Sequence, residues 1–180
     1  MNSSDLRLAG YASIISAVLS IPILFYTVYA SVTGATFTSN IIELIDVFIY
    51  AFVSMRLIQL LDELNFNSVN TTLTTSVILN IVGYVLALIA PHSESFGMFG
   101  IIAMIALGVL MVLIGVNLQK CPNDLHGHLK LFSLTWIISG VCLASIILIP
   151  FFILTWVAMN VILGMIFFKE ADRRQDLPIF

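Results

Sequence analysis

The sequence predicts an all-α integral membrane protein with six transmembrane helices and both termini in the cytoplasm. Composition, the length of the apolar segments and the placement of basic residues support this prediction. Of the 180 residues, 60% are hydrophobic and 9% are charged, and the mean hydropathy is +1.09. Soluble domains are about half apolar and about a quarter charged. The composition therefore assigns the chain to the membrane class.

The apolar residues form six segments, and a membrane-spanning helix needs about 20 residues at about 1.5 Å each. We expect a single helical bundle over residues 1–180, with helices at about 8–32, 41–61, 73–90, 97–118, 131–149 and 151–168. The first segment is about twice as long as the core of a secretory signal, so we interpret it as a transmembrane helix.

The stretch from Leu131 to Phe168 allows two interpretations. One continuous helix of this length would extend about 57 Å, nearly twice the thickness of the hydrocarbon core. A turn near Pro150 fits better, because proline disfavours helix at the residue before it. The two arms are either short spanning helices or a re-entrant hairpin. Both interpretations return the chain to the side from which it entered.

All seven basic residues lie on one side of this arrangement. They precede the first segment, end the second, flank the gap between the fourth and fifth, and follow the sixth: Arg7, Arg56, Lys120, Lys130, Lys169, Arg173 and Arg174. Because cytoplasmic loops retain Lys and Arg, this asymmetry predicts cytoplasmic termini in a multi-pass protein of the cell membrane.

The second segment carries the strongest candidate site. Glu43, Asp46, Tyr50 and Ser54 follow one another in steps of three and four, which places them on one helical face. Carboxylates inside a bilayer are costly and usually face protein or water, so these residues suggest an outward-facing cation or proton site. The alternative is a pair of acids favoured by the helix dipole at the membrane surface.

Arg56 lies inside the same segment and shares a face with Gln59 and Glu63. Its long side chain can reach the cytoplasmic interface, where Asp62 and Glu63 follow. We expect it to anchor or pair there, and contact with a substrate or a lipid headgroup is the alternative.

The gap between the fourth and fifth segments gathers a thiol, a carboxylate and two imidazoles: Cys121, Asp124, His126 and His128. These groups suit zinc or a related metal, but the loop lacks the paired spacing of established zinc motifs. A loop that turns at proline and glycine is the alternative interpretation. Elsewhere the sequence contains no catalytic motif, and we expect no cofactor.

Small residues predict close helix packing and partner helices. They recur at Gly97, Gly100, Ala103 and Ala106 in the fourth segment and at Gly140 and Ala144 in the fifth. Such faces allow backbones to approach, either within the chain, in self-association or with other membrane subunits. The net charge of −3 provides no basic surface for nucleic acid. The other expected partner is the lipid bilayer.

The C-terminal half resembles small uncharacterised multi-pass membrane proteins of bacteria and archaea. The similarity lies in Gly127-His128-Leu129-Lys130, in Ile149-Pro150 and in the apolar run from Val161 to Phe168. It covers less than half of the chain and implies no activity.

Three functions follow as hypotheses. The first is an accessory or scaffold subunit of a membrane assembly without catalysis, because the loops are short and no catalytic set is present. The second is a small channel or transporter with the acidic site described above. The third is a metal-dependent membrane enzyme built on the loop that contains Cys121.

Overall fold

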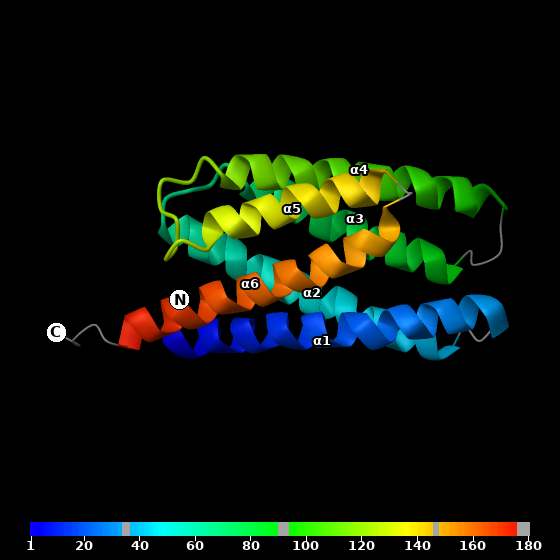
Figure 1. Cartoon of the computed structure of the whole chain (residues 1–180), viewed down its shortest axis with the longest axis horizontal. Helices are drawn as coiled ribbons and strands as arrows, with labels where there is room; N and C mark the ends of the chain where they lie inside the picture. Colours follow the sequence, from blue (N-terminus) through cyan, green and yellow to red (C-terminus); the bar gives the residue numbers. More distant parts are fainter. Residues whose placement is uncertain (34–36, 90–93, 146–147, 176–180) are drawn as a thin grey trace.

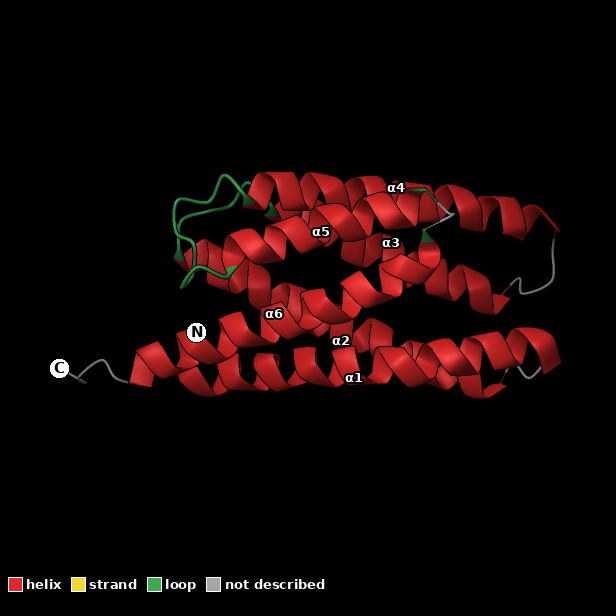
Figure 2. Ribbon diagram, viewed as in Figure 1, coloured by secondary structure: helices red, strands yellow, loops and turns green. Residues whose placement is uncertain are grey.

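The computed structural model describes residues 1–33, 37–89, 94–145 and 148–175, and at 23, 24, 26–33, 37–43, 87–89, 94–99, 149 and 150 it describes the backbone alone. These described residues form six helices and no strand (Figures 1 and 2). The helices are α1 (Ser3–Thr33), α2 (Phe37–Glu63), α3 (Asn70–Ile89), α4 (Glu94–Leu118), α5 (Leu129–Ala144) and α6 (Ile149–Gln175). The prediction of an all-α bundle with six helices is confirmed.

The helices form a closed ring. Within the described part of the chain, each helix packs against the helix before it and the helix after it, and α1 and α6 close the circle. No two helices on opposite sides of this ring approach each other closely in the described residues. The helices run side by side, and the start of α1 and the end of α6 lie at the same end of the bundle as the loops after α2 and α4 (Figure 1). We call this the terminal end. A ring of this kind has an interior that all six helices can reach.

Glycines permit the closest helix contacts in the ring. A Cβ atom at Gly108 would lie 2.7 Å from the backbone oxygen of Gly140 and 2.7 Å from the backbone nitrogen of Ala144. Between α1 and α6, a Cβ atom at Gly10 would lie 2.8 Å from the ring of Phe168. Gly140 and Ala144 therefore already have a partner helix inside the chain.

The fifth helix ends several residues before Pro150. The expected fifth helix extended to residue 149, but α5 ends at Ala144 and α6 begins at Ile149. Pro150 occupies the first turn of α6. Backbone N–H groups in this turn have no acceptor within the helix, so proline loses no hydrogen bond there, and its fixed φ favours the start of a helix. The proline therefore begins α6 and does not mark the end of α5.

Large apolar side chains fill the end of the ring nearest the termini. Leu6 of α1, Leu60 of α2, Leu118 of α4 and Phe167 of α6 are fully or almost fully buried there. Phe132 and Trp136 of α5 join this core and stack edge to face with centroids 6.0 Å apart. Because the apolar side chains of several helices meet here, this end of the ring has a tightly packed core.

The outer surface of the bundle is apolar. Phe25 is 71% exposed, and Leu154 is 68% exposed. By length and composition, four of the described helical stretches can cross a membrane: Ser3–Pro22, Leu44–Glu63, Gly100–Leu118 and Phe151–Gln175. The described parts of α3 and α5 are shorter apolar helices, and the 16 residues of α5 extend about 24 Å. These features suggest association with a membrane.

Candidate functional site

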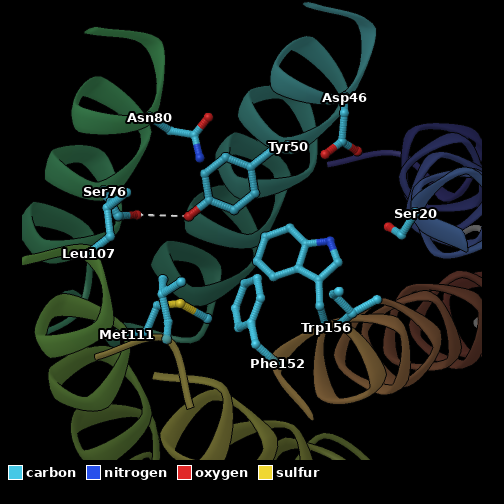
Figure 3. A pocket seen from close by; sticks show the side chains of 11 residues that line it. Ser20, Asp46, Tyr50, Ser76, Asn80, Leu107, Met111, Phe152 and Trp156 are labelled. Carbon is cyan, nitrogen blue, oxygen red and sulfur yellow. Dashed lines mark hydrogen bonds between the residues drawn. The ribbon is translucent and has the colours of Figure 1, made fainter. Parts of the chain in front are cut away.

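A cavity of about 320 Å³ lies inside the ring, and all six helices contribute to its wall. It is lined by Ser20, Asp46, Tyr50, Ser76, Asn80, Leu107, Met111, Leu143, Phe152, Ile153 and Trp156. Its volume is near the lower end of the range of about 300–1,000 Å³ that is usual for small-molecule sites. Figure 3 shows that its polar groups lie on two sides, with Asp46 and Ser20 on one and Ser76 and Asn80 on the other.

Asp46 supplies the negative charge of this cavity. The hydroxyl of Ser16, a buried residue of α1, donates a hydrogen bond of 3.0 Å to Oδ1 of Asp46. Ser20 lies one turn further along α1, and its hydroxyl donates to the backbone oxygen of Ser16 over 2.7 Å. Both serines therefore lie on one face of α1, and Ser16 is the one whose hydroxyl bonds the carboxylate. Asp46 is the only charged side chain among the described residues that line the cavity.

Aromatic rings form the wall between the two polar sides. The rings of Tyr50 and Trp156 lie 5.6 Å apart, and those of Phe152 and Trp156 lie 5.7 Å apart. The hydroxyls of Tyr50 and Ser76 share a hydrogen bond of 2.9 Å, which joins α2 to α3 and fixes the tyrosine ring. In Figure 3 the indole nitrogen of Trp156 lies on the side of Asp46 and Ser20. We call Tyr50, Phe152 and Trp156 the aromatic wall.

The structure places the predicted residues of α2 in different surroundings. Asp46 and Tyr50 line the cavity together, and Ser54 is buried one turn beyond Tyr50 without lining it. The side chain of Glu43 lies outside the described residues. Arg56 does not line the cavity but lies toward the terminal end of the bundle. The predicted helical face therefore contributes two side chains to one site.

Arg56 has partners of its own. Its guanidinium donates a hydrogen bond of 2.9 Å to Gln59, lies 4.0 Å from the carboxylate of Asp5, and stands 5.3 Å from the ring centroid of Phe52. The contact with Gln59 agrees with the prediction that Arg56 and Gln59 share one face of the helix. Glu63 instead pairs with the N-terminal ammonium of Met1 and with Arg174, at 2.5 Å from the latter.

Charged side chains tie α1, α2 and α6 together at this end of the bundle. The carboxylate of Glu170 is almost completely buried and accepts hydrogen bonds from Arg173 at 2.6 and 2.9 Å and from Arg174 at 2.9 Å. Arg174 also bonds Glu63, and Arg7 of α1 bonds Asp172 over 2.9 Å. We use the name charged cluster for Glu63, Glu170, Arg173 and Arg174. It lies beyond the apolar core, on the side away from the cavity.

The residues of the predicted metal loop serve other purposes. Cys121 is free and buried in the apolar core. Asp124 accepts hydrogen bonds from backbone N–H groups at the start of α5, including one of 2.8 Å from Lys130. His126 points to Glu170, with Nε2 3.6 Å from Oε2, and His128 Nδ1 lies 2.8 Å from the backbone oxygen of His126. Nowhere in the described residues do three such groups gather to hold a metal ion, so the metal site stays a prediction without structural support.

Most of the cavity was not predicted from the sequence. Ser20, Ser76, Phe152 and Trp156 were not singled out, although Ser13, Ser16 and Ser20 recur in steps of three and four along one face of α1. That spacing, together with their burial, is the signal that could have identified α1 as the partner of Asp46. Trp156 carries no comparable signal in its apolar surroundings.

No protein-family model matches this chain, and neither the curated proteins nor the solved structures that were searched contain a match. The site is therefore interpreted from its own geometry.

Proposed function

We propose that the protein crosses a membrane with all six helices and has both termini in the cytoplasm. The apolar outer surface supports contact with lipid along the bundle. All seven basic residues belong to the terminal end of the fold: Arg7, Arg56 and Arg174 pair there, and Lys120 and Lys130 flank the loop at that end. This asymmetry supports a cytoplasmic location for that end.

Within this arrangement, the protein acts as a small transporter or channel for a cation, with Asp46 as its binding group. The observation that carries this proposal is the cavity inside the closed ring, because every helix contributes to it and it contains one carboxylate without a basic partner in its described wall. Asp46 lies about 25 Å along α2 from Glu63 at helical rise, which places it inside a hydrocarbon core of about 30 Å and near its outward boundary. Ionisable groups within a membrane-spanning segment usually mark the path of an ion or substrate.

Because side chains fill the terminal end of the ring, we propose that a cation enters the cavity from the opposite, outward end. The apolar core and the charged cluster both lie between the cavity and the cytoplasmic end. In this conformation a cation reaches Asp46 from the outward end of the bundle. Movement to the cytoplasm then requires the helices that carry the charged cluster to separate.

Flux measurements test this function. Purified protein in proteoliposomes is expected to take up at least one cation from a panel of Na⁺, K⁺, methylammonium and choline. Asp46→Asn should abolish this uptake, because the amide keeps the size of the side chain and removes its charge. Asp62→Asn is the matched control: Asp62 is an exposed acid on the same helix, and its carboxylate contacts Asn70 outside the cavity. No uptake by the wild type, or equal uptake by Asp46→Asn, contradicts the proposal.

Cysteine labelling tests the orientation. Cys121 and Cys142 are buried and free, so the wild type should react slowly with a membrane-impermeant maleimide. Asn67→Cys and Gln119→Cys place thiols at exposed positions of the terminal end. In intact cells these variants should label only after the membrane is permeabilised. Labelling without permeabilisation would show that this end faces outward and would contradict the proposed orientation.

A scaffold function is the second candidate, and one surface favours it. Ala103 and Ala106 are exposed on α4, and a Cβ atom at Gly100 would meet nothing within 4 Å. This part of α4 is therefore free to receive a helix of another subunit, whereas the side chain position at Gly97 is outside the described residues. Purification from native membrane in mild detergent distinguishes the two: a scaffold is expected to retain partner subunits in fixed ratio.

A further inference from the structure

The chemistry of the cavity wall indicates what kind of cation it holds. Asp46 is half-buried, and a carboxylate with restricted access to water is stabilised by a compensating charge or by hydrogen bonds. Ser16 supplies one hydrogen bond to Asp46, and no described residue of the wall is basic. The described arginines are engaged elsewhere, for example Arg7 with Asp172 and Arg174 with Glu63. A cation that enters the cavity would supply the positive charge that the described wall lacks.

The wall does not suit a bare metal ion. Ca²⁺ takes six to eight oxygen ligands and Mg²⁺ about six, mostly from carboxylates, carbonyls and water. Here the second pair of polar residues, Ser76 and Asn80, lies on the side of the cavity opposite Asp46 (Figure 3). The described residues also bring no three acidic, histidine or cysteine side chains together. One carboxylate with nearby serines is a poor cage for a divalent metal ion.

The remaining surface suits an organic cation. Rings of Trp, Tyr and Phe attract cations over their faces, and Trp is the strongest of the three. The aromatic wall places three such rings in one row beside the carboxylate. Leu107, Met111 and Leu143 add apolar surface that an inorganic ion would not use. The volume of about 320 Å³ limits the occupant to a small molecule.

We propose that the cavity binds a small monovalent organic cation, an amine or quaternary ammonium compound, with its charged group at Asp46 and its apolar part against the aromatic wall. Ser76 and Asn80 receive a polar group at the other end of the molecule. This inference rests on the proposed function, since both place the cation at Asp46, and it adds the class of substrate.

The two tryptophans of the chain make a direct binding test possible. Trp156 lines the cavity, and Trp136 is buried in the apolar core. The Nε1 atom of Trp136 has no hydrogen-bond partner in the described structure, so Trp136→Phe removes no such bond. In that variant Trp156 is the only tryptophan and reports on the cavity. Trp156→Phe is the matched control, in which the remaining tryptophan lies outside the cavity.

Choline is the probe, and 3,3-dimethylbutan-1-ol is its uncharged carbon isostere. In Trp136→Phe, choline should change the fluorescence in a saturable manner, while NaCl at equal ionic strength should not. The uncharged isostere should bind roughly tenfold more weakly or worse, because it forms neither the cation–π nor the carboxylate contact. Asp46→Asn in the same background should weaken choline binding by a similar factor, and Trp156→Phe should show no response. Equilibrium dialysis of labelled choline against the wild type repeats the test without any substitution.

The outcomes separate this inference from the proposed function. Saturable binding of Na⁺ or K⁺ without binding of choline overturns the organic-cation inference and leaves cation transport standing. Choline binding that depends on Asp46, without uptake of any cation in proteoliposomes, supports the inference and overturns the transport function. Equal binding of choline and its uncharged isostere overturns the inference, because the carboxylate then plays no part.

Discussion

Ser16 and Asp46 join α1 to α2 through a hydrogen bond of 3.0 Å from the serine hydroxyl to Oδ1 of the carboxylate. Ser16 is buried between the helices, so this bond has little competition from water. It orients a charge that the rest of the described cavity wall does not neutralise. The carboxylate of Asp46 is thus held by a helix other than its own.

Ser16→Ala should weaken binding and stability together. Removing the hydroxyl should cost about 1–2 kcal/mol of stability, because the bond is made to a carboxylate inside the bundle. Affinity for choline should fall several-fold as the carboxylate loses its orientation. Both effects are measured by thermal unfolding in detergent and by equilibrium dialysis. Ser13→Ala is the control, since the hydroxyl of Ser13 donates to the backbone oxygen of Ala9 in its own helix. Equal affinities of the two variants would show that Ser16 does not position Asp46.

Gly108→Ala should destabilise the contact between α4 and α5. The new methyl group would lie 2.7 Å from backbone atoms of Gly140 and Ala144, and backbone cannot move aside as easily as a flexible side chain. Overpacking of this kind typically costs about 1–3 kcal/mol. The midpoint of thermal unfolding, followed by circular dichroism, measures the effect.

The matched control is Gly100→Ala on the same helix. A Cβ atom there meets nothing within 4 Å, and alanine favours helix over glycine by up to about 1 kcal/mol. This variant should be neutral or slightly more stable. If the two alanine variants unfold at the same temperature, the close approach of α4 and α5 is contradicted.

Glu170→Gln should loosen the charged cluster. The carboxylate is 1% exposed and bonds two arginines. Without its charge, Arg173 loses the acid that it bonds, whereas Arg174 keeps Glu63 as a counterion. We expect a loss of about 1–3 kcal/mol, less than for a fully buried pair because the side chain of Arg173 is 51% exposed. Unfolding by heat in detergent provides the measurement. Asp172→Asn should cost less than about 1 kcal/mol, since its pair with Arg7 is exposed. The reverse order of the two variants would contradict the role of Glu170.

The helical fold could be predicted from the sequence because each apolar run specifies its own helix. The boundary near Pro150 is an exception with a local reason. The sequence predicted that the fifth helix would end at residue 149, but Ile149 and Pro150 begin α6. The site was harder to predict. Helical periodicity placed Asp46 and Tyr50 on one face, but it says nothing about which helices that face meets.

Trp156 and Ser76 belong to the site only because of how the helices close on one another. Trp156 lies 106 residues after Tyr50 and Ser76 lies 26 after it, and no local pattern links these positions. The same holds for Gly140 and Ala144, whose spacing predicted a close contact without identifying Gly108 as the partner. Tertiary packing supplied this information.

The closing contact between α1 and α6 also determines when the site comes into being during synthesis. Chains are made from the N-terminus, so α1 to α5 leave the ribosome before α6. Until α6 inserts, the contact of Gly10 with Phe168 does not exist, and the growing chain lacks Trp156 and Phe152. Asp46 at that stage faces an unfinished bundle. The cavity is therefore completed only when α6 joins the bundle, and no nascent chain that lacks α6 possesses it.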